Sequence, residues 1–210
     1  YEILRQLTVV FFCISSVVAA GLFSLITPFI CDIWLSPAYE LGWGTAVLCI
    51  VVLLIKIMGL PLSLMMGVTG LFEKEKNAGA SSAVLNLIVS LALVRPYGMT
   101  GVLLGTLLSY LLQICYRYVI FFRDFLEMKE EAIRYARDLG EYTAVMILEV
   151  AVTRRIIPLI YGNGGMTPFI FCFVLCILVP LALNGVFFGR GWRLQSIVKM
   201  VRGMKRSGSR

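Results

Sequence analysis

Most of this chain consists of long apolar runs separated by short polar segments. An α-helix rises ~1.5 Å per residue and the hydrocarbon core of a bilayer is about 30 Å thick, so a run of about 20 residues can cross it. The runs are continuous rather than alternating, which disfavours a membrane β-barrel. The pattern therefore predicts an all-α membrane protein, a bundle of six transmembrane helices at about 7–30, 45–71, 78–94, 99–122, 141–161 and 167–188.

The third and fourth predicted helices are expected to form a hairpin. Pro96 lacks an N–H group and disfavours a helical backbone in the residue before it, so the third helix is expected to end by Val94. Gly98 can adopt the positive φ that a reversal of the chain needs. Gly101 and Gly105 lie four residues apart and place small residues on one helix face, which allows another helix backbone to approach closely.

Other segments interrupt or follow the predicted helices. Residues 123–140 form an amphipathic connector that is expected to lie at the cytoplasmic membrane surface, and residues 189–210 form a basic cytoplasmic tail. Gly59 and Pro61 predict a break within the second helix. The chain begins at Tyr1 without an initiator Met, so we expect it to be part of a longer chain.

The composition agrees with the membrane class and excludes several kinds of chemistry. Hydrophobic residues make up 60% of the 210 residues and charged residues only 15%, whereas about a quarter of the residues in a soluble domain are charged. The absence of histidine excludes His-based acid–base catalysis, Ser-His-Asp triads and histidine-ligated metals. The six cysteines lie in or beside apolar runs without CxxC spacing and are interpreted as small hydrophobic residues. We therefore expect neither a metal nor a cofactor.

The distribution of Lys and Arg predicts the orientation of the helices. Fifteen of the 19 cationic residues fall in segments on one side of the predicted topology, Arg95 alone falls on the other side, and three lie within predicted helices. By the positive-inside rule the side with fifteen is cytoplasmic, so both ends of the chain are expected there. This topology accounts for the net charge of +7, and membrane lipids rather than nucleic acid are the expected partners.

Several short motifs in and beside the first, third and fourth predicted helices resemble one family of bacterial transporters. These motifs are Pro28-Phe29-Ile30, Ile33-Trp34-Leu35 with Tyr39, Asn86-Leu87-Ile88-Val89-Ser90-Leu91, Tyr97-Gly98-Met99-Thr100-Gly101-Val102 and Gly105-Thr106. Together with the charged segment before the hairpin, they resemble the polysaccharide-unit flippases of the multidrug/oligosaccharidyl-lipid/polysaccharide exporter superfamily. The resemblance covers nearly the whole chain and corresponds to the second of the two six-helix lobes in that family.

The resemblance implies that this chain is the C-terminal lobe of a two-lobe transporter, with an N-terminal six-helix lobe as its missing partner. It implies a protein of the bacterial cytoplasmic membrane that is not an enzyme. Such a protein moves a lipid-diphosphate-linked oligosaccharide, the repeat unit of a polysaccharide, outward by alternating access. Family members often carry basic residues directly before the proline of the second helix, whereas here Gly59 and Leu60 precede Pro61 and the nearest cation is Lys56.

Polar and charged side chains within apolar runs are the candidate site residues, because charge is unfavourable in hydrocarbon. Lys56, Arg154 and Arg155 are candidates to bind the anionic diphosphate; the alternatives are snorkelling to the membrane surface or, for Lys56, pairing with a carboxylate. Asn86 is a further candidate substrate contact, or else a hydrogen-bonding residue between helices. Glu149 is the candidate ion-coupling carboxylate, or else the partner of an arginine.

Three other functions stay open at this point. A drug/cation antiporter lobe of the same superfamily would be expected to hold several carboxylates at mid-depth, where only Glu149 qualifies. A membrane-embedded glycosyl- or acyltransferase would need an acidic cluster at the membrane interface, for which Asp32 and Glu40 are the candidates. A non-transporting membrane scaffold is the third, and it would not need Lys56 at mid-depth.

Single-cysteine variants in a cysteine-free background test the predicted orientation. A membrane-impermeant thiol reagent added from outside should label Tyr97→Cys and Asn163→Cys but not Lys76→Cys or Met128→Cys, because the charge distribution places the last two in the cytoplasm. Labelling after permeabilisation should reach all four and is the control. The reversed pattern would contradict the orientation and the lobe assignment together.

Overall fold

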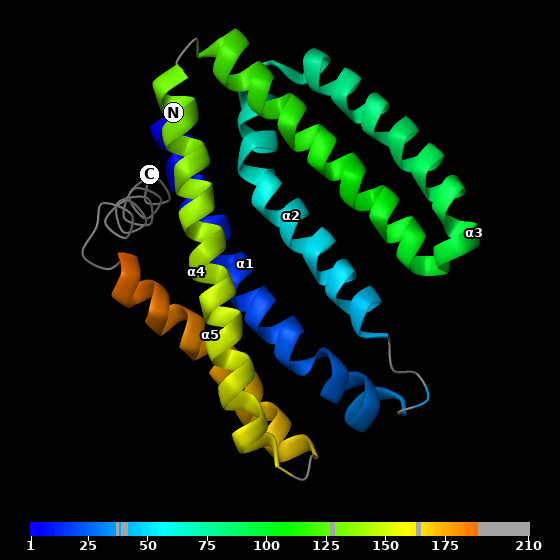
Figure 1. Ribbon diagram of the computed structural model, residues 1–210. Helices are drawn as coiled ribbons and strands as arrows, with labels where there is room; N and C mark the ends of the chain where they lie inside the picture. The colour runs from blue at the N-terminus through cyan, green and yellow to red at the C-terminus, as the bar shows by residue number, and fades with distance from the viewer. Residues whose placement is uncertain (37, 39–41, 127–128, 163–164, 189–210) are drawn as a thin grey trace, which may run out of the picture. The chain divides into compact units, whose positions relative to one another are not determined.

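The computed structural model describes residues 1–36, 38, 42–126, 129–162 and 165–188, and these are almost entirely helical (Figure 1). In chain order the elements are α1 (Glu2–Pro28), the π-helix η1 (Phe29–Trp34), α2 (Trp43–Val68), α3 (Phe72–Val119), the π-helix η3 (Ile120–Phe125), α4 (Lys129–Tyr161) and α5 (Met166–Phe188). The described residues contain no β-strand, which confirms the predicted all-α class. The predicted basic tail lies outside the described residues, as do Tyr39, Glu40, Met128 and Asn163.

Four helical segments are long and apolar enough to cross a membrane, in agreement with the predicted membrane class. They are Glu2–Trp34, Trp43–Val68, Glu73–Arg123 and Met166–Phe188. The third of them contains both predicted hairpin helices. Helix α4, which contains the fifth predicted crossing, is not among the four and carries Glu149, Arg154 and Arg155. The count of six crossings therefore stays a prediction.

The helices form two compact units, and each is described by itself. Unit 1 contains α1, η1, α5 and the part of α4 that follows Gly140, whereas unit 2 contains α2, α3, η3 and the part of α4 up to Gly140. Helix α4 is continuous from Lys129 to Tyr161, so much of the predicted connector belongs to the same helix as the fifth predicted crossing. Gly140 does not interrupt this helix, because a glycine keeps its N–H group and costs only about 1 kcal/mol relative to alanine.

In unit 2, α3 is a hairpin whose two antiparallel arms reverse at Gly98 (Figure 1). Gly98 has a φ of 56°, which confirms the predicted positive φ. The first arm continues past Val94 to Gly98, so the predicted end by Val94 is wrong. Pro96 lies in the last turn of this arm, where it removes a single backbone hydrogen bond, and packing between the arms outweighs that loss.

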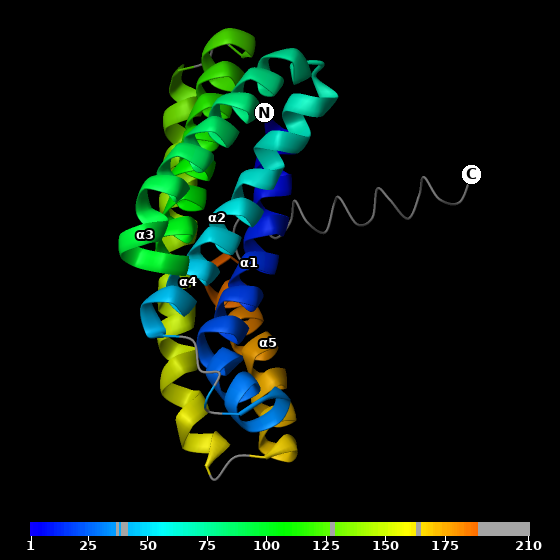
Figure 2. The same ribbon diagram turned by 90° about the vertical axis from the view of Figure 1, so that its right-hand side faces the viewer.

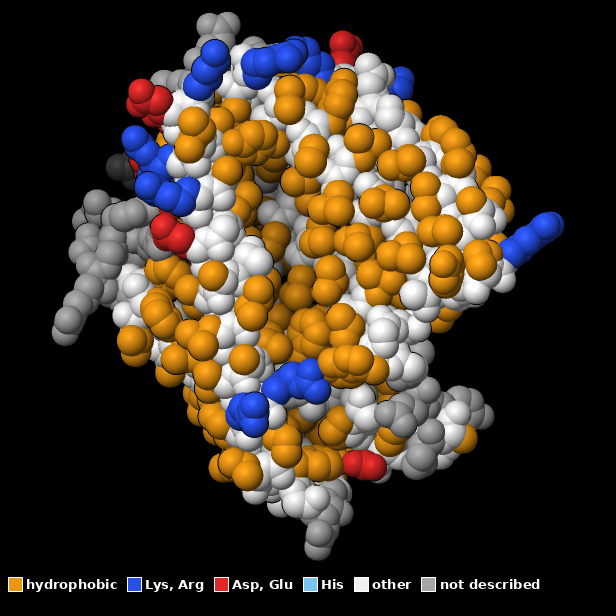
Figure 3. All heavy atoms as spheres, viewed as in Figure 1, with side chains coloured by type: hydrophobic (Ala, Val, Ile, Leu, Met, Phe, Trp, Pro, Cys, Tyr) orange, Lys and Arg blue, Asp and Glu red, His pale blue; other side chains and the backbone are white. Residues whose placement is uncertain are grey.

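The two arms of α3 approach closely at the glycines of the second arm. A Cβ atom at Gly101 would clash with the backbone carbonyl of Leu93, and one at Gly105 would lie 3.0 Å from the backbone nitrogen of Ser90. This confirms the prediction that these small residues allow close helix packing. Hydrophobic side chains cover much of the exposed surface of this hairpin (Figure 3). Leu87, Ile88 and Leu91 of the first arm are among the exposed residues.

Helix α2 packs against α3, and it runs in the same direction as the second arm. The Thr45 and Thr100 hydroxyl oxygens lie 2.9 Å apart near one end, and further along a Cβ atom at Gly59 would lie 3.0 Å from Cδ1 of Ile114. Helix α2 is helical through Gly59 and Pro61, so the predicted break is wrong. The small size of Gly59 instead allows close contact with α3. Pro61 is accommodated because prolines are tolerated within membrane helices that pack against neighbours.

In unit 1, α1 packs against α5, which runs in the opposite direction (Figures 1 and 2). The stacked rings of Phe12 and Tyr142, with centroids 4.7 Å apart, join α1 to α4, and the Phe188 ring of α5 meets both at an angle. Further along, one residue of α1, one of α4 and two of α5 form a buried apolar cluster: Leu25, Ile157, Cys172 and Cys176. The three helices therefore share a core, with α4 parallel to α1.

Alanine substitutions test the close approach of the two α3 arms. Gly101→Ala and Gly105→Ala should each lower the free energy of unfolding by about 1–3 kcal/mol, because the added methyl group meets backbone atoms. Gly67→Ala is the control, since a Cβ atom there meets nothing within 4 Å and alanine should raise helix stability by about 0.5–1 kcal/mol. Thermal unfolding of the purified variants measures both effects, and equal stability of all three would contradict the packing.

Candidate functional site

Lys56 lies near the middle of α2, on a face that unit 2 by itself leaves exposed. Leu53, Leu60 and Leu64 share this face and are 36–48% exposed. The Lys56 Nζ atom lies 5.8 Å from the centre of the Tyr110 ring in the second arm of α3, which is within the range of a cation–π interaction. Among the described residues no carboxylate pairs with Lys56. It is thus a cation in the middle of an apolar helix without an anionic partner there.

Asn86 lies in the first arm of α3 and is half-buried. Its Oδ1 atom accepts a hydrogen bond of 2.9 Å from the Ser90 hydroxyl, and its backbone carbonyl lies opposite Gly105. The side chain is therefore engaged beside the contact between the two arms. This geometry agrees with the alternative in which Asn86 supports helix packing.

Glu149 is fully buried in unit 1, on the face of α4 that packs against α1. Tyr142, Thr153 and Ile157 are buried on the same face, as expected for residues about two turns or one turn apart. The Ser16 side chain of α1 faces the Glu149 carboxylate. No arginine among the described residues pairs with this carboxylate, and Ser16 is the hydrogen-bonding side chain beside it.

Arg154 and Arg155 are exposed on α4, away from the buried face. They precede Tyr161, at the end of the helix, by seven and six residues, which corresponds to about 10 Å. A long arginine side chain can span much of that distance, so the geometry agrees with snorkelling toward the membrane surface. The structure brings neither arginine to Glu149.

Asp32 lies in η1 and accepts a hydrogen bond of 2.8 Å from the Tyr161 hydroxyl. This contact ties the end of α4 to the π-helix that follows α1. Glu40, the other residue considered for a transferase, lies outside the described residues. Asp32 therefore has a structural role in joining these two elements. The described residues do not include the pair of Asp32 and Glu40 that a transferase would need.

The sequence reasoning did not identify Asn184 as a polar residue of interest. Its Nδ2 atom donates a hydrogen bond of 3.0 Å to the Ser16 hydroxyl, and the two residues are 4% and 0% exposed. The amide therefore meets the same hydroxyl that faces Glu149. The rule that singled out Asn86, a lone amide within an apolar run, would also have selected Asn184.

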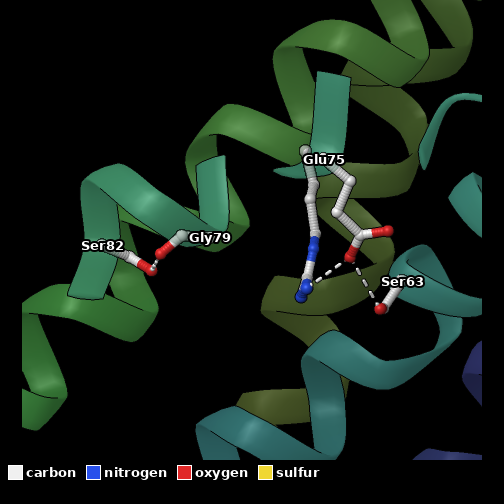
Figure 4. Close-up of polar contacts among 5 residues, drawn as sticks. Ser63, Glu75, Gly79 and Ser82 are labelled. Carbon is white, nitrogen blue, oxygen red and sulfur yellow. Dashed lines mark hydrogen bonds and ion pairs between the residues drawn. The ribbon is translucent and has the colours of Figure 1, made fainter. Parts of the chain in front are cut away.

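A second polar cluster, also not identified from the sequence, joins α2 to both arms of α3 (Figure 4). Glu75 forms an ion pair with Arg117 and accepts a hydrogen bond of 3.0 Å from the Ser63 hydroxyl. Arg117 and Glu75 are only 13% and 20% exposed. This cluster joins the helices of unit 2 near one end of α2. The contact between the Thr45 and Thr100 hydroxyl groups joins them near the opposite end.

The described residues contain no group of three or more Cys, Asp or Glu side chains arranged to hold a metal ion, and all six cysteines are free thiols. Comparison with protein-family models, with curated proteins and with solved structures finds no match for this chain. The functional argument therefore depends on the residues themselves, and above all on Lys56 and Glu149.

A double-mutant cycle tests the ion pair between α3's arms. The variants Glu75→Gln and Arg117→Met, alone and combined, should give a coupling energy of about 0.5–3 kcal/mol in thermal unfolding, because the pair is largely shielded from water. Glu73→Gln combined with Arg117→Met is the control and should give a coupling near zero, since Glu73 is exposed. A coupling of zero in both cycles would show that the ion pair does not stabilise unit 2.

Proposed function

We propose that this chain is the C-terminal six-helix lobe of a two-lobe flippase that moves a lipid-diphosphate-linked oligosaccharide across the bacterial cytoplasmic membrane. In this proposal Lys56 faces the cavity between the lobes and attracts the diphosphate of the substrate. Glu149 is the ion-coupling carboxylate, and both ends of the chain are cytoplasmic. The motif resemblance supports the family, and one structural observation supports the site.

That observation is the environment of Lys56. Its face of α2 is otherwise apolar, and no described carboxylate neutralises it. A lysine that faces lipid at the centre of a helix is unfavourable by roughly 2.5–3.5 kcal/mol. A water-filled cavity removes most of this cost, and an anionic ligand there gives the ammonium group a partner.

The chemistry of the substrate fits this arrangement. A diphosphate carries negative charge that must leave water when the lipid-linked glycan enters the protein, and a nearby cation offsets part of that cost. Lysine acts as a compact point charge on a flexible stem, so it can follow a phosphate group during alternating access. Tyr110, beside the Lys56 ammonium group, can hold it in place before substrate arrives.

Export of glycan by the full-length protein tests the role of Lys56. Lys56→Ala should lower export at least about tenfold, equivalent to about 1.4 kcal/mol of lost interaction with the substrate or its transition state. Lys56→Arg should retain part of the activity because the charge survives, and Lys56→Glu should be the least active because it repels an anion. All three should reach the membrane at wild-type abundance.

Lys76→Ala is the matched control, since it removes one exposed cation from the charged segment that begins α3. It should leave glycan export unchanged. Wild-type export from Lys56→Ala and Lys56→Glu at wild-type abundance would eliminate Lys56 as a substrate contact.

A further inference from the structure

The part of α4 that belongs to unit 2, residues 129–140, separates its charges by exposure. The segment carries three cations and three carboxylates, so its net charge is zero. All three cations are exposed, whereas one carboxylate is buried and another is half-buried. The cations are Lys129, Arg134 and Arg137, and the carboxylates, in order of decreasing exposure, are Glu130, Glu131 and Asp138. A segment that is neutral in sequence therefore presents a basic surface.

The same separation extends to the two ends of α3. Glu75 and Arg117 neutralise each other there. Figure 3 shows Lys and Arg side chains gathered where α3 ends and α4 begins. Among the side chains that the structure describes in residues 73–76 and 117–140, six cations but only two carboxylates are exposed. The cations are Lys74, Lys76, Arg123, Lys129, Arg134 and Arg137, and the carboxylates are Glu73 and Glu130.

Two of these cations flank an exposed apolar side chain on α4. Lys129, Ile133 and Arg137 are spaced by four residues, so they lie in a line on one face of the helix. Ile133 is 71% exposed, although burial of such a side chain is favourable by about 1.5–3 kcal/mol. Among the described residues no carboxylate pairs with Lys129 or Arg137. This face therefore combines an apolar group exposed to water with two cations that lack an anion.

The opposite face of this segment is packed within unit 2. The Tyr118 hydroxyl donates a hydrogen bond of 2.6 Å to the backbone carbonyl of Ala132. The Tyr135 ring is 2% exposed and lies 5.4 Å, between centroids, from the Phe122 ring of η3. The exposed face is thus held in place, and a ligand that binds there does not have to order the helix first.

The length of the α3 hairpin indicates the depth of this face in a membrane. Tyr118 follows Gly98 by 20 residues in the second arm, which corresponds to about 30 Å, the thickness of a bilayer core. A hairpin that crosses the bilayer with Gly98 at one surface therefore brings Tyr118 to the other. The hydrogen bond from Tyr118 then places Ala132, and with it Ile133, at that second surface.

We infer that the α4 face formed by Lys129, Ile133 and Arg137 binds the headgroup of an anionic phospholipid such as phosphatidylglycerol. The two cations pair with phosphate oxygens, for which the planar guanidinium group of Arg137 is well suited. Ile133 lies against the upper part of the acyl chains and leaves water. An acidic protein would supply negative charge but no acyl chain for Ile133, so the lipid fits this face better.

The choice of an anionic lipid follows from charge. The phosphate of phosphatidylglycerol has no cation beside it, whereas the choline group of phosphatidylcholine cancels the charge of its phosphate. Each Lys or Arg near an anionic lipid surface strengthens binding about fivefold. The inference goes beyond the proposed function and requires only that unit 2 crosses a membrane, so it can fail or succeed independently of glycan transport.

Quenching by spin-labelled lipids tests the site. The cysteine-free full-length protein with Ala136→Cys, an exposed position beside Ile133, carries a fluorophore and is reconstituted in phosphatidylcholine vesicles. Spin-labelled phosphatidylglycerol should quench the fluorophore at about 10–30-fold lower mole fraction than spin-labelled phosphatidylcholine, because two cations contribute. Lys129→Gln combined with Arg137→Gln should remove most of this selectivity.

Lys76→Gln combined with Arg95→Gln is the matched control, since it also removes two exposed cations but leaves the face intact. Its selectivity for phosphatidylglycerol should equal that of the wild type. An equal loss in the control would overturn the site, because any two cations would then serve. Equal quenching by both lipids in the wild type would also overturn it, and absence of quenching by either lipid would show that the face lies outside the membrane and would do the same.

Discussion

The structure depends on the fact that an apolar environment offers no partner to a polar group. Most polar side chains within the apolar helices therefore find their partner in the protein. The hydroxyls of Thr8, Thr106 and Thr153 each donate to the backbone carbonyl four residues earlier, at 2.7–3.0 Å. Thr45 and Thr100 pair with each other. Helices satisfy their own backbone groups in the same way, which is why a chain of this composition folds almost entirely as helix.

The charged side chains of Lys56 and Glu149 lie in different surroundings. Lys56 is exposed on a face of unit 2 that is otherwise apolar, so its partner must come from outside the unit or from water. Glu149 is enclosed by unit 1 itself, where the Ser16 side chain of α1 lies beside its carboxylate. An exposed cation suits a large anionic substrate, whereas an enclosed carboxylate suits a small cation.

Close packing supplies the remaining contacts that order the helices. Between apolar surfaces in lipid, contact at short range rather than exclusion of water holds helices together. Gly101, Gly105 and Gly59 allow that contact within unit 2, and the rings of Phe12, Tyr142 and Phe188 supply it in unit 1. The Glu75–Arg117 ion pair links the two arms of α3 near their ends. There the pair is partly shielded from water but is not buried deep in the apolar part of the helices.

The sequence by itself determined the helical class, the membrane-type composition, the reversal at Gly98 and the close approach at Gly101 and Gly105. These follow from local physics: run length, the conformational freedom of glycine and the absence of a Cβ atom. It did not determine that α2 stays helical through Pro61, or that the first arm of α3 passes Val94, because packing against a neighbour outweighs a local propensity. Only the tertiary structure decided which polar residues meet. Ser16, Glu149 and Asn184 lie far apart in the sequence, and no local pattern could show that Ser16 of α1 meets both Glu149 of α4 and Asn184 of α5.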